Sequence, residues 1–468
     1  MTLTSRQSQF DVLIVGGGDV GAAIARTLGR HPLRVGLVEA SSDIGDGTSK
    51  ANTAILHTGF DATPGTLESE LVAKGYHLLR DYAAAAGIPM EPLGALLVAW
   101  DREQLDALPG LAEKAARNGY TETRHVDRDE LYRREPHLGP GALGALEIPG
   151  ESIICPWTTP FAFAVEALGY GVEILLDTEV RGVRLEPDGS TLVETGRGAL
   201  RTRYLVNAAG LRSDEVDRML GHEDFTVTPR RGELIVFDKF ARSLVRHILL
   251  PVPTALGKGV LISPTVFGNV MLGPTAEDLG DKTRTGSSPE GIDTLLAKGR
   301  RLMPDLLEEE VTTVYAGLRA ATEHGDYQLR LHADQRYVCV GGIRSTGLTS
   351  ALAIGAHVRD LLGKAGLELG EPVPARIPHM PTIGEASLRP YQRPDLIAED
   401  PEYGTMVCHC ERVSRGEIRD ALASPLPART LEGLRRRTRA TLGRCQGFYC
   451  GAEVRHLLAE SAPAGEGR

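Results

Sequence analysis

The fold is decided near the start of the chain, where residues 11–28 read DVLIVGGGDVGAAIARTL. The apolar run 11–15 predicts a buried strand, and the small and aliphatic residues of 22–28 predict a helix beginning directly after the glycines. A second apolar run, 34–38, ends at Glu39. A strand, a glycine-rich turn, a helix and a second strand in this order predict the βαβ unit of an α/β fold.

The glycines have the G-x-G-x-x-G spacing of a dinucleotide site. Gly16 permits a tight turn, Gly18 lets backbone amides approach a pyrophosphate, and Gly21 lets helix and strand pack closely. The helix N-terminus turns its positive dipole end to the phosphates, and Glu39 can accept hydrogen bonds from a ribose diol. An ordinary glycine-rich turn is the alternative, but the surrounding elements all agree with a nucleotide site.

Length and composition restrict the remaining possibilities. A chain of 468 residues predicts about three domains of about 150 residues each. Its 52 basic residues against 62 acidic ones argue against a nucleic-acid-binding protein. No run approaches the length of a membrane-spanning helix, and the apolar stretch 10–25 is too interrupted for a signal peptide. We therefore expect a cytoplasmic protein without a transmembrane segment.

Later glycine-bearing segments favour FAD over NAD. The polar loop 41–52 can wrap a large cofactor, the strand 204–208 ends in small residues, and the strand 337–341 leads through glycines into a helix over 351–362. The residues assigned to the cofactor in and beside these segments are Thr48, Ser49, Lys50, Asn52, Val180, Ala209, Gly210, Gly342, Gly347, Leu348 and Thr349.

With the signature-like loop 48–61, residues 10–360 resemble the FAD-dependent glycerol-3-phosphate dehydrogenase family of the D-amino-acid-oxidase superfamily. The resemblance implies a Rossmann-type FAD-binding domain interleaved with an antiparallel-sheet substrate domain. We expect the FAD-binding domain over 9–85, 150–218 and 314–370, and the substrate domain over 86–149 and 219–313.

The same resemblance implies catalytic residues. His57 would take the hydroxyl proton, although a hydrogen-bonded structural histidine is the alternative. Lys258, Arg319 and Arg344 would anchor an anionic handle of the substrate, because a guanidinium fork suits a phosphate or carboxylate. Surface or structural ion pairs are the alternatives for these cations. Ser345 would donate to substrate or flavin, or cap the following helix, as could the neighbouring Thr346.

The implied reaction is hydride transfer from sn-glycerol 3-phosphate to FAD, which gives dihydroxyacetone phosphate. Three alternatives stay open: a 2-hydroxy acid such as L-2-hydroxyglutarate as substrate, a secondary amine as substrate, and a non-catalytic electron-transfer subunit. The substrate would accordingly be a small phosphorylated polyol or hydroxy acid.

Four cysteines lie close together near the C-terminus. Cys408 and Cys410 form C-x-C, Cys445 and Cys450 form C-x4-C, and the spacing favours iron–sulfur over zinc. The segment resembles the bacterioferritin-associated-ferredoxin-like domain, which implies a 2Fe–2S centre. We expect a linker over 371–404, rich in proline, and a small helical cluster domain over 405–460.

Two helices are expected between the cysteines, capped by Ser414 and Thr430. The second ends in the basic run 435–439, for which three interpretations are open: a nucleic-acid patch, a solvated helix face, or charge balance for the cluster or an acidic redox partner. A flavin joined to a cluster suggests a dehydrogenase that passes electrons to partner subunits or a quinone-linked acceptor, with peripheral association at the inner membrane through such partners.

Overall fold

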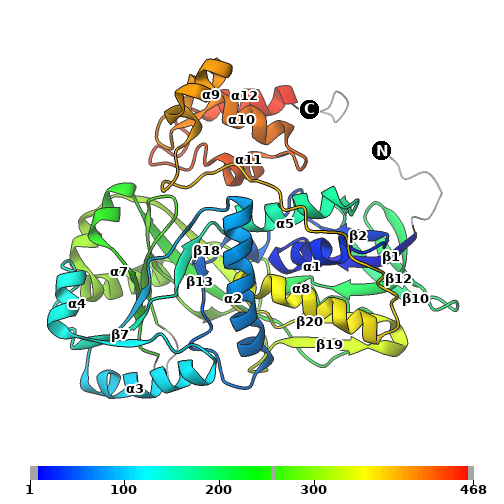
Figure 1. The fold of residues 1–468 in the computed structure, drawn as a ribbon, viewed down its shortest axis with the longest axis horizontal. Coiled ribbons are helices and arrows are strands. Elements are labelled where there is room, and N and C mark those ends of the chain that lie inside the picture. The colour runs from blue at the N-terminus through cyan, green and yellow to red at the C-terminus, as the bar shows by residue number, and fades with distance from the viewer. Residues whose placement is uncertain (1–8, 254–258, 462–468) are drawn as a thin grey trace.

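The computed structural model describes residues 9–253 and 259–461, so the predicted site residue Lys258 lies outside the described part of the chain. Two large β-sheets lie side by side, and a smaller helical domain from the C-terminal segment sits over them (Figure 1). The predicted α/β class, with a FAD-binding part, a substrate part and a C-terminal small domain, is confirmed.

The first sheet contains the predicted nucleotide unit. Its strands follow the order β10-β11-β12-β1-β2-β9, and β20 joins β12 while β19 joins β20. Strands β9, β2, β1, β12 and β20 run parallel. The bounds are β1 (Gln9–Val15), β2 (Val35–Val38), β9 (Glu173–Leu175), β10 (Val180–Leu185), β11 (Thr191–Thr195), β12 (Gly198–Asn207), β19 (Gln328–His332) and β20 (Tyr337–Gly341).

Three apolar helices pack together beside this sheet, and a long helix packs against the third of them (Figure 1). The former are α1 (Asp19–Gly29), α5 (Thr158–Gly169) and α8 (Gly347–Lys364), and the latter is α2 (Leu67–Ala86). The short helix α6 (Ser213–Met219) follows β12. Within the described residues, no helix is both long and apolar enough to cross a membrane.

The second sheet is mostly antiparallel and follows the order β17-β13-β16-β15-β14-β5-β7-β6, with β18 paired to β13. Its strands are β5 (Ala95–Ala99), β6 (Arg124–Asp127), β7 (Gly144–Ile148), β13 (Thr228–Phe237), β14 (Ile248–Pro251), β15 (Leu261–Pro264), β16 (Val270–Gly273), β17 (Glu277–Asp278) and β18 (Val311–Ala321). Its helices are α3 (Arg102–Arg117), α4 (Arg128–Arg134) and α7 (Pro289–Leu302). A small sheet of β3 (Ile55–Leu56), β8 (Ser152–Ile154) and β4 (Met90–Glu91) completes the body.

The predicted linker is extended only in its first part. Residues 366–389 contain no helix or strand, but α9 (Pro394–Glu399) and two 3-10 turns follow. Pro390, Pro394 and Pro401 each stand at the start of one of these three elements. The amide hydrogen that proline lacks would make no helical hydrogen bond at that position. These three prolines therefore begin short helices, while those in the first part of the linker lie in extended chain.

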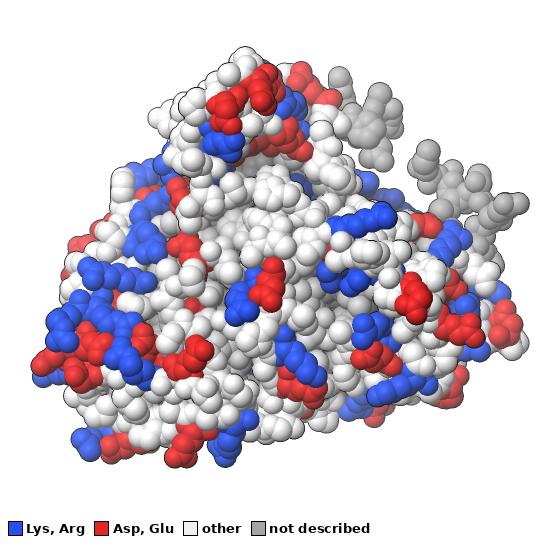
Figure 2. Space-filling view, in the orientation of Figure 1, with Lys and Arg blue, Asp and Glu red and all other residues white. Residues whose placement is uncertain are grey.

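The C-terminal domain contains β21 (Met406–Cys408), β22 (Val413–Ser414), α10 (Arg415–Ala423), α11 (Leu431–Thr438) and α12 (Gly451–Ser461). Both expected caps are confirmed: Ser414 and Glu417 form a capping box on α10, and Thr430 accepts the amide hydrogen of Gly433 in α11. On the face of the molecule in Figure 2, basic and acidic side chains are interspersed.

Candidate active site and cluster site

The glycine turn between β1 and α1 has a backbone conformation that residues with side chains could not adopt without clashes. Gly16 has a φ of +103°, and a Cβ atom there would lie 2.4 Å from the carbonyl oxygen of Ala208. A Cβ atom on Gly21 would lie 1.9 Å from the carbonyl oxygen of Gly16. Gly18 is the N-cap residue of α1. The turn thus has the compact backbone that lets a pyrophosphate approach the first amides of the helix.

The loop that follows β2 folds back onto this turn. The carboxylate of Glu39 accepts the amide hydrogens of Gly17 and Ser41, both at 2.7 Å. The Ser49 hydroxyl oxygen accepts the amide hydrogen of Asp19 at 3.0 Å. The predicted ribose contact and the predicted flavin loop therefore meet at the N-terminus of α1.

The other predicted residues of this loop hold its shape. The Thr48 hydroxyl donates to the carbonyl oxygen of Leu318 at 2.9 Å, and Asn52 donates to the carbonyl oxygen of Ser49 at 2.8 Å. Lys50 pairs with Asp46 at 3.0 Å. A cavity of about 480 Å³ lies between this loop, β18 and residues 282–287, and Thr48 and Lys50 line it.

A buried carboxyl group at the same turn was not predicted as a site residue. Asp19 is the first residue of α1, and its side chain is 5% exposed. Burial raises the pKa of this carboxyl to about 7, which the Ser49 hydrogen bond opposes. Its Oδ1 atom has no hydrogen-bond partner among the described residues. A polar atom left unpaired in this way marks a place that a polar ligand can complete.

The remaining cofactor candidates lie where strands of the first sheet end. Because β1, β12 and β20 are parallel neighbours, their carboxyl ends meet at one edge, the usual position for a ligand in such sheets. Ala209 and Gly210 follow β12, while Gly342, Gly347, Leu348 and Thr349 lie between β20 and the first turn of α8. Val180 begins β10 in the outer antiparallel part of the sheet. The glycines and strand ends thus provide a continuous cradle that fits a dinucleotide.

His57 is held between two elements that are distant in sequence. Its amide donates to the Thr349 hydroxyl oxygen at 3.0 Å, and its Nδ1 atom lies 2.8 Å from Oε2 of Glu151. Glu151 is fully buried and also accepts hydrogen bonds from the amide and hydroxyl of Thr58, at 2.7 and 2.9 Å. A carboxylate on Nδ1 favours the tautomer with the proton on that nitrogen, which leaves Nε2 as the proton-accepting atom.

Arg319 lies on β18 without a carboxylate partner among the residues that the structure describes. Its Nη1 atom donates to the carbonyl oxygen of Thr275 at 3.4 Å, and it stands opposite Arg230 in the β13–β18 ladder. Burial, and then Arg230, lower the pKa of its guanidinium. Gly232 makes room for it, since a Cβ atom there would lie 2.8 Å from Nη2. Arg319 is half-buried, and a cation partly removed from water without a counter-ion is costly, which favours an anionic ligand beside it.

Arg344 and Ser345 have different surroundings. Arg344 pairs with Glu68 of α2 at 2.5 Å and also donates to the carbonyl oxygen of Gly325. Ser345 is exposed. The Thr346 hydroxyl donates to Glu68 at 2.8 Å and makes no capping hydrogen bond to α8, so its expected capping alternative is wrong. Glu68 thereby fixes the start of α8, which carries Thr349 and so positions His57.

The four C-terminal cysteines act on one another's pKa. Burial raises the pKa of the Cys410 thiol, to which Cys445 and Cys408 contribute, and burial and then Cys408 raise that of Cys450. The amide of Tyr449, above all, lowers the pKa of the Cys445 thiol and favours its thiolate. Four thiols that influence one another in this way fit the ligand set of a 2Fe–2S cluster, in which each of two irons takes two cysteines.

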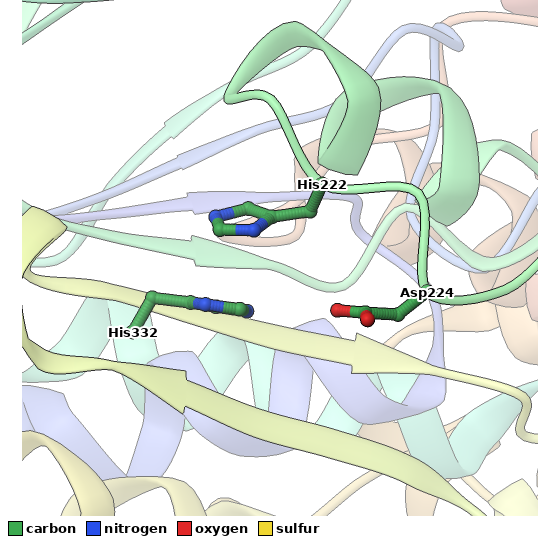
Figure 3. Close-up of side chains that lie close together, drawn as sticks. All are labelled: His222, Asp224 and His332. Carbon is green, nitrogen blue, oxygen red and sulfur yellow. The ribbon is translucent and has the colours of Figure 1, made fainter.

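A second group of side chains that could bind a metal lies at the end of β19. His222, Asp224 and His332 bring ligand atoms within 4.8 Å of one another (Figure 3). The two rings stack with centroids 3.6 Å apart at 27°, so their in-plane lone pairs run nearly parallel instead of converging. Asp224 pairs with Arg330 at 2.6 Å, and His222 bonds to Gln335 at 2.8 Å. Partners within the chain thus occupy Asp224 and His222, while Nε2 of His332 has none among the described residues. Because the two rings do not converge, we assign metal chemistry to the cysteines.

The basic run at the end of α11 is neither a solvated helix face nor a nucleic-acid patch. Arg436 and Arg437 are largely buried and pair with Asp43, in the loop after β2. Arg439 pairs with Glu411 and lies 4.2 Å from the ring centroid of Phe267. None of the three interpretations includes a partner in this same chain, and the structure corrects this. The basic run docks the small domain onto the body.

Comparison with known proteins agrees with this geometry. The model of the DAO family of FAD dependent oxidoreductases matches residues 11–361. The chain belongs to this family. Residues 406–460 match the BFD-like 2Fe-2S binding domain. This member of the DAO family is therefore an FAD-dependent oxidoreductase of glycerol-3-phosphate-dehydrogenase-like type, and its cofactors are FAD and a 2Fe–2S cluster, as predicted.

Three proteins of known activity are similar to this chain. A glycerol 3-phosphate dehydrogenase of Caloramator mitchellensis is 35% identical over 456 residues, covering 96% of this chain and 94% of that protein. The solved L-alpha-glycerophosphate oxidase of Mycoplasma pneumoniae with FAD bound has a TM-score of 0.75 at 29% identity, covering 80% of this chain and 98% of its own. A mitochondrial L-2-hydroxyglutarate dehydrogenase of Mus musculus is 32% identical, covering 56% of this chain and 60% of that protein.

Several residues of these sites carried no local signal in the sequence. Glu151 lies in a Pro-Gly-Glu turn between β7 and β8, and Glu68 lies in the first turn of α2, where an acid is ordinary. Asp19 stands inside the glycine motif at a position whose residue type the motif leaves open. Only the folded chain shows that these carboxyl groups face His57, Arg344 and the phosphate turn.

Proposed function

We propose that this chain oxidises sn-glycerol 3-phosphate to dihydroxyacetone phosphate and passes the electrons onward through its cluster. FAD, when bound, supplies the acceptor for the hydride that leaves the C2 carbon of the substrate. The chain's own residues bind the phosphate, orient the C2 hydroxyl and remove its proton. The observation that carries the proposal is the half-buried Arg319 without a carboxylate partner among the described residues, together with the whole-length similarity to a glycerol 3-phosphate dehydrogenase.

His57 is the general base in this proposal. Its Nε2 atom takes the hydroxyl proton as the hydride departs, and the ketone forms without a transient alkoxide. The imidazolium that results is stabilised by the carboxylate of Glu151 on Nδ1, which does not itself move a proton. Thr58 and Thr349 fix this pair of residues, so the imidazole is oriented before the substrate arrives.

Arg319 is the anchor for the substrate phosphate. A guanidinium fork binds a phosphate through two parallel hydrogen bonds, and burial strengthens this attraction. We assign Lys258 to the same anion. Arg344 and Ser345 stay candidates for contacts with the substrate or the flavin. Since Glu68 already neutralises Arg344, we expect its contribution to substrate binding to be smaller than that of Arg319.

An L-2-hydroxy acid is the second candidate substrate. The similarity to L-2-hydroxyglutarate dehydrogenase and the chemistry of Arg319, which suits a carboxylate as well as a phosphate, favour it. Anaerobic mixing of the holoenzyme with each compound decides between them, because the oxidised flavin absorbance disappears only when a substrate delivers its hydride. We expect bleaching by sn-glycerol 3-phosphate at micromolar to millimolar concentration and none by L-2-hydroxyglutarate or a secondary amine.

The cluster would carry the electrons away one at a time. Its four ligands belong to a domain docked against the flavin loop, which supports a transfer within the chain. Freeze-quenched anaerobic samples test this: after substrate is added, the electron paramagnetic resonance signal of the reduced cluster should follow flavin bleaching. Full bleaching with a cluster that stays oxidised would exclude the relay and leave the dehydrogenase proposal intact.

A further inference from the structure

The small domain contacts the flavin-binding body through two buried arginines of α11. Arg437 forms a two-pronged pair with Asp43, with N···O distances of 2.7 and 2.8 Å, and its guanidinium lies 3.9 Å from the ring centroid of Phe161. Arg436 bridges Asp43 at 2.8 Å and Asp46 at 2.5 Å. Charge-assisted pairs of this kind, largely removed from water, are among the stronger polar contacts in proteins.

The two aspartates belong to the predicted flavin loop, which packs against the glycine turn. The amide of Gly45, between them, donates to the carbonyl oxygen of Gly17 at 2.8 Å. Ile44 is fully buried against the same turn, since a Cβ atom on Gly17 would lie 2.8 Å from its Cδ1 atom. The segment 43–46, which forms ion pairs with the two arginines, is thus in direct contact with the glycine turn.

The approach of α11 to this loop depends on a glycine. A Cβ atom on Gly433, in the first turn of α11, would lie 2.8 Å from Oδ2 of Asp43. The same oxygen accepts hydrogen bonds from both arginines. The sequence therefore combines a small residue with two cations at the point of closest contact.

We propose that Arg436 and Arg437 are positioning residues for the FAD-binding loop, so that docking of the cluster domain strengthens FAD binding. FAD and the small domain both order the segment 43–46, one from the phosphate turn and the other from the outside. A ligand that meets an already ordered loop loses less conformational freedom on binding. The coupling is reciprocal: bound FAD stabilises the docked arrangement by the same factor. This inference requires the two cofactors but not any particular substrate.

The test measures FAD dissociation from the full chain, followed by the flavin fluorescence that appears on release. In Arg437→Gln, Asp43 loses its two-pronged partner, and we expect the FAD dissociation constant to rise at least about fivefold. Arg435→Gln is the matched control, because Arg435 belongs to the same helix but its side chain bonds, among the described residues, only to Glu432 and Thr441 of its own domain. Its dissociation constant should equal that of the unmodified protein.

A second variant leaves every charge in place. Gly433→Ala adds the Cβ atom that would contact Asp43, while alanine is the better helix former and so does not weaken α11 itself. We expect an intact cluster spectrum together with weaker FAD binding, in the same direction as Arg437→Gln. If Arg437→Gln and Gly433→Ala both retain the dissociation constant of Arg435→Gln, the coupling does not exist. The pairs of Arg436 and Arg437 with Asp43 then only attach the small domain.

A double-mutant cycle distinguishes an effect of the Arg437–Asp43 pair on FAD binding from a general loss of stability. Asp43→Asn removes the same ion pairs from the side of the loop. If the arginines act through Asp43, Asp43→Asn combined with Arg437→Gln weakens FAD binding by clearly less than the product of the two single effects. Independent effects that multiply would overturn the proposal.

Discussion

The Nδ1 atom of His57 lies 2.8 Å from Oε2 of Glu151, a carboxylate that is fully buried and bonded twice to Thr58. The two residues are 94 positions apart and are brought together where β3 pairs with β8. A histidine fixed in this way is oriented by a neighbour that itself cannot turn. The proposed general base requires such an orientation, and the pair leads to the first prediction.

Glu151→Gln should slow anaerobic flavin reduction by roughly 10- to 100-fold, because the amide can no longer stabilise the imidazolium that forms on proton transfer. The ascending limb of the pH–rate profile should move to lower pH, since loss of an adjacent carboxylate favours the neutral imidazole. Stopped-flow absorbance across the pH range measures both effects. A merely structural role for Glu151 would lower stability without moving the profile.

The chain contains a matched control for this variant. Glu135 is also fully buried and accepts from Nδ1 of His247 at 2.6 Å, at the start of β14 in the second sheet. Glu135→Gln removes a buried histidine–glutamate pair of the same kind, outside the predicted flavin and substrate contacts. We expect a stability loss comparable to that of Glu151→Gln, but an unchanged pH profile of flavin reduction.

Arg319→Met should move stability and substrate affinity in opposite directions. The guanidinium is partly buried without a carboxylate partner among the described residues, so an apolar side chain of similar length relieves a desolvation cost and raises the melting temperature of the ligand-free protein. Truncating a buried charge contact to the substrate costs about 2 kcal/mol or more, which corresponds to about a 30-fold increase in KM.

Inorganic phosphate provides a check of the Arg319 prediction that does not use turnover. We expect millimolar phosphate to raise the melting temperature of the unmodified protein, because ligand binding to the folded state stabilises it, and to leave Arg319→Met unchanged. Equal stabilisation of both proteins would place the anion site elsewhere.

Local patterns were sufficient for the parts of the fold that are local. The turn at Gly16, the strand–helix unit after β20, and the caps at Ser414 and Thr430 depend on residues a few positions apart. Their backbone requirements appear directly as residue types, as Gly21 shows by its contact with Gly16.

Contacts between distant residues could not be predicted in the same way. Arg344 and Glu68 are 276 positions apart, and Arg436 and Asp43 are 393 apart. Each partner alone has an ordinary local explanation, an acid in a first helical turn or a basic run at a helix end. Which pairs meet is decided by how the two sheets and the small domain pack, and no spacing in the sequence encodes that.

Metal analysis tests the assignment of the four cysteines. The purified protein should contain about two irons and two acid-labile sulfides per chain, and Cys445→Ser should lose most of both. Cys339→Ser is the control, because Cys339 is fully buried in the core of the first sheet, distant from the cluster domain. Its iron content should match that of the unmodified protein, whereas stoichiometric zinc without sulfide would identify a structural zinc site.

Asp19 gives the last prediction, a pH dependence of stability for the FAD-free protein. Burial raises the pKa of its carboxyl from the ordinary value of 3.8 to about 7, so the folded chain binds a proton that the unfolded chain has lost between these two values. The stabilising contribution is complete below pH 3.8 and disappears as the pH rises to 7, at a cost of up to about 1.4 kcal/mol per pH unit. Asp19→Asn keeps a neutral side chain throughout, and comparison with the unmodified protein cancels the titration of all other groups. Urea unfolding at pH 5 and pH 8 should therefore show the variant gaining stability relative to the unmodified protein as the pH rises, and parallel behaviour of the two proteins would mean that Asp19 is ionised in the folded state throughout this range.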